Sequence, residues 1–250
     1  MWCKDHGMTV TISNLDLSLH IGRIAPMPHA FPELRKVTFD GEKQISTLKV
    51  FNHMNIPSLK DLFLVDCRVW DTVSLSSLLQ RSACQLEQLV LQTTDATHTT
   101  GVCTGELLIL LRLTPTLTTL VLTQLLPNAI TDALLEALIA QDATPAVLPV
   151  LTALVLAGIY LFSTDQLLNM LESRTTPHNH HGLRTVDITL PSRQVSIPHL
   201  QRFSAVMRAV ESSSLACLDE ARSQVRIQVG KYTPLDWCHN RPVGRGSDSL

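Results

Sequence analysis

The 250-residue sequence is poor in charge, in aromatic side chains and in glycine. Charged residues make up 17% of it and aromatic residues 4%, and it has 10 glycines. A disordered chain is excluded, because such chains combine low hydrophobicity with high net charge. The shortage of glycine excludes a collagen-like repeat. The net charge of −2 gives the chain as a whole no affinity for polyanions.

Cysteine is too scarce and too scattered for a disulfide scaffold. The six cysteines form no C-x-x-C pair, and a chain of this length buries a core without cross-links. The N-terminal sequence MWCKDH lacks the apolar segment of a secretory signal peptide. We therefore expect reduced thiols and a cytoplasmic or nuclear location.

Two uncharged runs, between Arg112 and Asp132 and between Asp142 and Asp165, approach the length of a membrane-spanning helix. Pro149 interrupts the second run and its flanks are acidic, while threonines and prolines dilute the first. Their leucine spacing fits another structure, so no membrane insertion is predicted.

Leucine is abundant, with 42 residues, and it follows a repeated L-x-x-L-x-L pattern. The six clear copies, at spacings of 25 to 34 residues, begin at Leu34, Leu59, Leu86, Leu117, Leu151 and Leu183. Ile12-x-x-Leu15-x-Leu17 fits in front of them, and a degraded copy, Val225-x-Ile227, follows. Such a repeat indicates one structural unit stacked many times.

Between the copies, apolar residues spaced three and four apart are typical of helices with one buried face. The predicted helices are 71–81, 105–113, 131–140, 164–174 and 198–211, with Thr164 as the N-cap of the fourth, and 41–55 is ambiguous. The predicted fold class is α/β: a leucine-rich-repeat solenoid with parallel strands on the concave face and helices on the convex face. Residues 1–30 are expected to form an N-terminal capping region with a first partial repeat, 31–230 the repeat domain, and 231–250 a disordered C-terminal tail.

Three stretches are more specific: R-S-x-C-x-L-x-x-L-x-L at 81–91, the T-P-x-L run at 114–122 and M-L-E-S-R at 170–174. Together with FPELRKVTF at 31–39, they resemble the leucine-rich-repeat part of F-box-like proteins that form large families in mushroom-forming fungi. The resemblance covers roughly residues 10–230. It departs from the common repeat consensus, because only Cys67 fills a position where a buried asparagine or cysteine is expected.

In that family an F-box precedes the repeats and docks on the Skp-type linker of a cullin–RING ubiquitin ligase, while the repeats recruit the substrate. The resemblance implies the recruiting role for this sequence. Met1 lies almost directly before the first repeat, so no F-box and no binding to the ligase linker are expected here.

In a strand of this pattern the leucines point inward and the intervening residues point to the opposite face. With strands about 4.8 Å apart, the middle positions of four consecutive copies form an apolar strip about 15 Å long. These positions hold Phe63, Val90, Val121 and Val155. The polar neighbours of the strip are Lys36, Asp61, Gln88, Gln92, Thr119 and Asp187.

We predict that the strip is exposed and binds a protein partner, since contiguous exposed apolar surface marks interaction sites. Replacing Val90 and Val121 by aspartate is then expected to abolish binding without unfolding the protein. An alternative stays open: β-branched residues suit strands whether or not they bind anything.

Other chemistry is weakly indicated. His178, His180 and His181 are candidate metal ligands in a loop, but no fourth ligand is evident, and a solvated loop is the alternative. The basic residues near the C-terminus lack interleaved aromatics, so no nucleic-acid partner is expected. Motifs such as G-x-S-x-G and H-E-x-x-H are missing, so we expect no enzymatic activity and no cofactor.

The sequence thus favours a non-catalytic protein–protein recognition module that resembles the substrate-recruiting repeats of F-box proteins in ubiquitin ligases. Two alternatives stay open. One is a small metal-binding protein or metal-dependent enzyme that uses the 178–181 histidines. The other is a truncated fragment without independent function.

Overall fold

The computed structural model describes residues 8–13, 29–40, 51–65, 71–93, 102–125, 128–140, 147–158, 161–175, 182–190, 195–216 and 224–229. These residues form an eight-stranded parallel sheet, five helices and a small two-stranded sheet. The predicted α/β fold class is confirmed.

The strands of the large sheet lie side by side in chain order, and each is parallel to the one before it. They are β1 (Met8–Ser13), β3 (Leu34–Asp40), β5 (Asp61–Val65), β6 (Gln88–Gln92), β7 (Thr119–Thr123), β8 (Ala153–Ala157), β9 (Thr185–Leu190) and β10 (Gln224–Val229). The small sheet pairs β2 (His29–Ala30) with β4 (Met54–Asn55). Two parallel strands that follow each other in the chain need a long crossover connection, which returns the chain to the end of the sheet at which the strands start. The strand order therefore requires such a connection between each pair of neighbouring strands.

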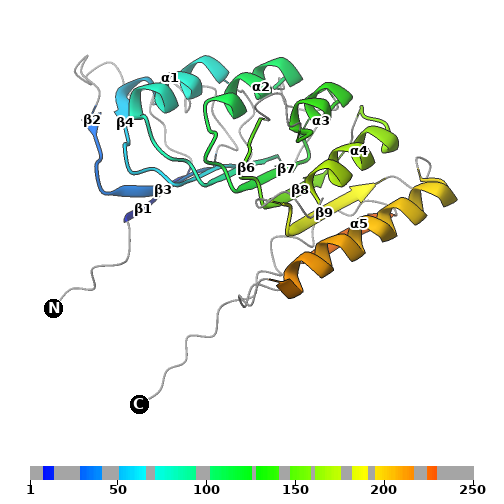
Figure 1. The fold of residues 1–250 in the computed structure, drawn as a ribbon. Coiled ribbons are helices and arrows are strands. Elements are labelled where there is room, and N and C mark those ends of the chain that lie inside the picture. The colour runs from blue at the N-terminus through cyan, green and yellow to red at the C-terminus, as the bar shows by residue number, and fades with distance from the viewer. Residues whose placement is uncertain are drawn as a thin grey trace.

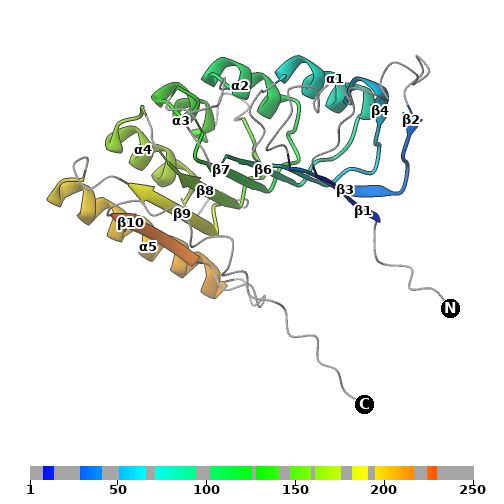
Figure 2. The ribbon, with the colours of Figure 1, turned by 180° about the vertical axis from the view of Figure 1, so that it is seen from behind.

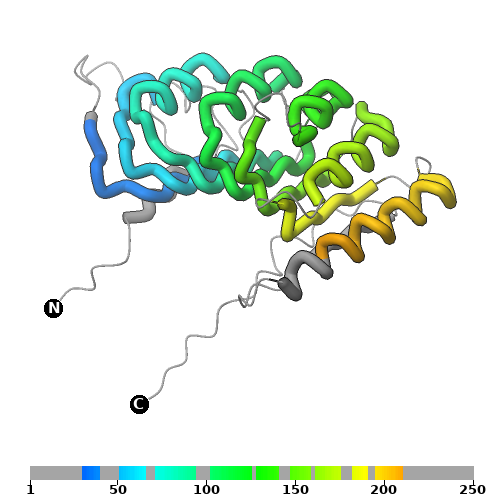
Figure 3. The backbone as a smooth tube through the Cα atoms, viewed as in Figure 1, coloured from blue at the N-terminus to red at the C-terminus, as the bar shows by residue number. Residues whose placement is uncertain are grey.

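Helices supply the crossovers from β5 onward. They are α1 (Thr72–Ser82), α2 (Thr104–Arg112), α3 (Asp132–Leu138), α4 (Thr164–Arg174) and α5 (Ile197–Ala216). Each helix packs against the next, and α1–α4 cover the same face of the sheet (Figures 1 and 2). The tube in Figure 3 follows the same strand-and-helix path from one unit to the next.

The helix predictions are confirmed, apart from their ends and one cap. Thr164 is not the N-cap of α4, because Ser163 holds that position and its hydroxyl accepts a hydrogen bond from the Gln166 amide at 3.1 Å. Thr164 is instead buried in the first turn. Sequence cannot separate two adjacent hydroxyl residues that are both good caps.

The register places equivalent residues of successive units directly beside one another. The paired leucines in the fourth and sixth positions of the pattern are Leu62, Leu89, Leu120 and Leu154, and Leu64, Leu91, Leu122 and Leu156. All of them are buried in one core between the sheet and the helices. Burying one such side chain stabilises the fold by about 1.5–3 kcal/mol, and a five-residue strand cannot do this without its neighbours.

The first copy of the pattern lies five residues earlier than the sequence predicts. β1 pairs Val10 with Val37 and Ile12 with Phe39. Val10 and Ile12 therefore fill the fourth and sixth positions, and the predicted frame that starts at Ile12 is wrong. The predicted last copy, Val225–Ile227, is confirmed, because β10 pairs it in register with β9.

None of the helices in the described part of the chain is long and apolar enough to cross a membrane. The two uncharged runs that approach this length contribute β7 and β8 to the sheet. The proposed C-terminal tail, 231–250, lies outside the described residues.

An arginine from α4 holds the connector that leads from α3 into β8. Arg174 donates to the carbonyl oxygens of Leu138 at 2.5 Å, Leu148 at 2.9 Å and Val147 at 2.8 Å. It is 1% exposed, and burial lowers its pKa to about 10, so it is still charged at neutral pH. Among the described residues no carboxylate pairs with it. The Leu138 carbonyl lies at the negative end of the α3 dipole, and together with the two connector carbonyls it takes the place of a carboxylate.

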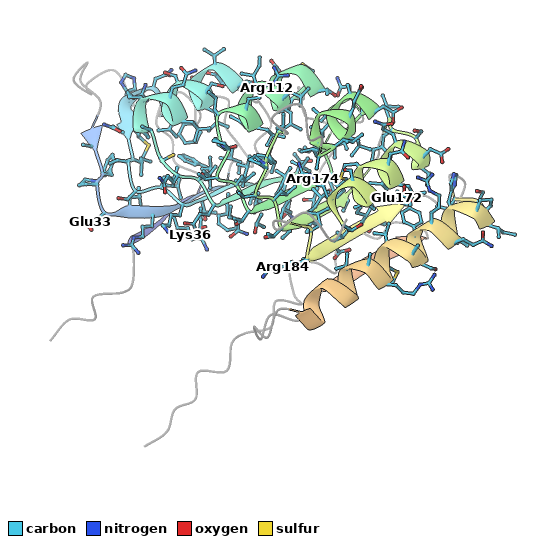
Figure 4. All side chains as sticks on the ribbon, viewed as in Figure 1. Glu33, Lys36, Arg112, Glu172, Arg174 and Arg184 are labelled. Atoms are coloured by element: carbon cyan, nitrogen blue, oxygen red, sulfur yellow. The ribbon has the colours of Figure 1, made fainter. Side chains whose placement is uncertain are left out.

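Arg81 in α1 has the same role before β5. It donates to the carbonyl oxygen of Met54 at 2.8 and 3.0 Å and to that of Phe51. Arg112 ends α2 but is exposed, and the connector 113–118 that follows α2 is short. Figure 4 places Arg174 inside the protein and Arg112 on the row of helices. An arginine thus binds backbone carbonyls where the connector is long, and it is buried at Arg174 and half-buried at Arg81.

Replacing Arg174 by methionine should leave three buried carbonyls without donors and lower the free energy of unfolding by about 2–4 kcal/mol. Arg112→Met removes an arginine from the matching end of α2 and should change it by less than about 0.5 kcal/mol. Urea unfolding followed by circular dichroism measures both. Equal midpoints for the two variants would contradict the role of Arg174.

The turn after β8 packs tightly against the turn after β7. Gly158 has a φ of 140°, and a Cβ there would lie 3.1 Å from the backbone N and Cα of Gln124. Gln124 has a φ of 56°, and its amide donates to the Ala157 carbonyl at 2.6 Å. Two left-handed turns therefore stack with backbone against backbone, which requires glycine at position 158.

Gly158→Ala should lower the free energy of unfolding by about 1–3 kcal/mol, because the strained φ and the close backbone both oppose a methyl group. Gly105→Ala is the control: the nearest atom to its new Cβ would be Cys103 Sγ at 3.9 Å. Within α2 this change should be neutral or stabilising by up to about 1 kcal/mol. Thermal unfolding of both variants tests this, and a stabilised Gly158→Ala protein would rule it out.

Candidate protein-binding face

The residues between the inward leucines lie on the face of the sheet opposite the main core. We call them the strand face. From β3 to β9 it consists of Lys36, Thr38, Asp61, Phe63, Val65, Gln88, Val90, Gln92, Thr119, Val121, Thr123, Ala153, Val155, Ala157, Thr185, Asp187 and Thr189. Strand geometry separates them from the leucines, because successive side chains point to opposite faces.

The predicted apolar strip forms a cluster of its own, separate from the main core. Phe63, Val90, Val121 and Val155 are successive pairing partners across β5, β6, β7 and β8. Their exposed fractions are only 9%, 4%, 2% and 7%. The prediction that the strip is exposed is therefore wrong.

The burial has a simple geometric cause. Each of these side chains has a neighbour about 4.8 Å away on either paired strand and further neighbours two residues along its own strand. For Val121 the neighbours within β7 are Thr119 and Thr123. Side chains at this spacing close over one another and exclude water. The strip is thus a second, smaller apolar layer.

Charged residues stand at both ends of this layer. The Nζ of Lys36 lies 4.5 Å from the centroid of the Phe63 ring, a cation–π contact. At the other end, the register places Asp187 beside Val155, with Arg226 of β10 as the next residue in line. Lys36 and Asp187 therefore flank the apolar residues as the sequence predicts.

The remaining predicted residues are half-buried and lie in columns beside the apolar layer. Asp61, Gln88 and Thr119 are successive partners at the start of their strands, and Gln92 is at the end of β6. All ten residues of the predicted site thus share one face of the sheet. Their role in binding stays a prediction.

Sequence reasoning missed two threonines at the ends of strands. Thr123 is buried, and its hydroxyl has no hydrogen-bond partner in the part of the chain that the structure describes. Thr93 is also buried, and its hydroxyl donates to the Gln124 carbonyl at 2.5 Å. Thr93 thus links the end of β6 to the next unit. The alternating pattern places Thr123 on the strand face but not among the predicted site residues, because the sequence carries no signal that its hydroxyl lacks a partner.

No group of three histidine, cysteine or carboxylate side chains in the described part of the chain is placed to hold a metal. His178, His180 and His181 lie outside the described residues. Cys84 and Cys103 are free thiols, and burial raises the pKa of Cys84, which lowers its reactivity.

No protein-family model and no curated protein matches this sequence. The geometry and chemistry of the strand face therefore carry the functional assignment, together with the sequence resemblance described above.

The burial of Val121 reverses the expected effect of the aspartate substitutions. Val121→Asp should lower the free energy of unfolding by about 3 kcal/mol or more, because it places an unpaired carboxylate in an apolar layer. Val73→Asp, at a position in α1 that is 79% exposed, is the control. It should change this energy by less than about 0.5 kcal/mol. Chemical unfolding of both variants tests this. An unchanged unfolding midpoint for Val121→Asp would contradict the burial of Val121 and support an exposed strip.

Proposed function

We propose that this chain is a leucine-rich-repeat solenoid that recognises a partner protein on its strand face and performs no chemistry of its own. The observation that supports this most directly is the constant register of the parallel strands, which places equivalent residues of successive units side by side. Repeat arrays of this kind present one extended surface, and they use it to bind other proteins.

The spacing of the two layers supports a concave strand face. Paired strands lie about 4.8 Å apart, whereas packed helices lie about 8–10 Å apart. An array with strands on one side and α1–α4 on the other must therefore bend toward its strands. Such a bend curves the columns of strand-face residues, so that side chains from neighbouring strands, such as Gln88 and Thr119, converge toward a partner.

The proposed class of partner follows from the sequence resemblance. Repeats similar to these recruit the substrates of F-box ubiquitin ligases, so we propose that the partner is a protein destined for modification, in the cytoplasm or nucleus. The Lys36 and Asp187 ends of the apolar layer would then form the polar rim of the contact, as is usual in protein interfaces.

Site-specific photo-crosslinking tests the proposal. A benzophenone side chain replaces Gln88 on the strand face or, as the matched control, Val73 on the helix face, and each purified variant is irradiated in extract of the source organism. We expect a discrete protein adduct from position 88 only, which excess unmodified protein suppresses. Both variants should retain one cooperative unfolding transition, as an independent domain does.

Adducts from position 73 alone, or from neither position, would contradict binding on the strand face. The absence of a cooperative transition in the unmodified chain would favour the fragment without independent function.

A further inference from the structure

The strand face of β6, β7 and β8 has no charged side chain. Its nine residues are Gln88, Val90, Gln92, Thr119, Val121, Thr123, Ala153, Val155 and Ala157. Charges occur on the neighbouring strands, with Asp61 on β5 and Asp187 on β9. A charged group of a partner placed over the nine residues would lose hydration without gaining an ion pair, which is unfavourable.

The side chains on this face become smaller from β5 to β8. Phe63 and the two glutamines of β6 give way to the threonines of β7 and then to Ala153 and Ala157. The two alanines are half-buried rather than covered. A partner can therefore approach the backbone of β8 more closely than that of β5.

Thr123 provides an independent sign of a ligand. It is 6% exposed, its Oγ1 has no hydrogen-bond partner among the described residues, and it shares its face with Val121 two residues away. A buried hydroxyl without a partner destabilises a free protein, and native structures contain few of them. Its register neighbours are Gln92 and Ala157. A backbone amide or carbonyl of a bound segment would satisfy this hydroxyl.

We infer that the strand face of β6–β8 binds an uncharged, extended segment of its partner protein, rich in hydroxyl, amide and small apolar side chains. Acidic and basic segments do not fit these nine residues. The inference rests on the proposed function, because it names the chemistry of the segment that the same face takes.

Selection from a phage-displayed library of random dodecapeptides against the intact chain tests this inference. Enriched peptides should contain fewer Asp, Glu, Lys and Arg residues than the unselected library. Ala153→Lys should weaken their binding about tenfold or more, because the introduced charge must be desolvated. Val73→Lys, on the far side of the molecule, should leave their affinity unchanged.

The outcomes separate this inference from the proposed function. Enriched peptides that bind Ala153→Lys more weakly but are rich in charged residues would overturn the inference and leave the proposed function in place. Peptides that Ala153→Lys does not affect would overturn both. If no peptide is enriched, the inference of a linear uncharged segment fails, while crosslinking from position 88 still decides the proposed function.

Thr123→Val gives a second readout, because it removes the unpartnered hydroxyl and keeps the branched shape. The unfolding midpoint should stay the same or rise. Affinity for the selected peptides should fall about fivefold, as expected for one lost hydrogen bond. A destabilised variant would show that the hydroxyl already has a partner, and an unchanged affinity would show that the segment does not reach it. Either result would overturn the role of Thr123.

Discussion

Each strand of the large sheet buries its inward leucines only when the strand before it has the same register. A slip of one residue would turn Leu120 and Leu122 outward and bring Val121 into the main core. The matched register also stacks the four residues of the smaller apolar layer and aligns the polar columns beside it. The core, the second layer and the candidate binding face therefore depend on one pairing rule.

The periodicity of the sequence is enough to predict the matched register of the strands. It does not predict that the apolar side chains of the strand face are buried. The L-x-x-L-x-L spacing locates the strands β3 and β5 to β9, and apolar residues three and four apart locate the helices, because both patterns are local properties. The leucine spacing misplaces β1, since Ile12 fits two frames and only pairing with Phe39 selects one. It also misjudges Val121, because the sequence predicts which strands lie beside β7 but not that the packed side chains leave Val121 only 2% exposed.

The units differ in length, and the differences are absorbed in the connectors rather than in the strands. Where the connector is long, Arg81 or Arg174 binds its described end through hydrogen bonds to carbonyl oxygens. Sequence alone does not distinguish these arginines from Arg112, because most arginines at helix ends are solvated. The same limit applies to Thr123, whose missing partner becomes visible only when every neighbour is in place.

Apolar layers on both faces of the sheet also affect how the chain is made. The strands β5 to β8 each carry three consecutive buried apolar residues, LFL or LVL. During synthesis each newly formed strand is an open edge with such a triplet, until the next unit emerges and pairs with it. Exposed apolar edges of this kind are templates for aggregation. Because the strands pair in chain order, each unit exposes its edge until the next unit is synthesised. The yield of folded protein therefore depends on whether translation of the next unit is faster than association of these edges with other chains.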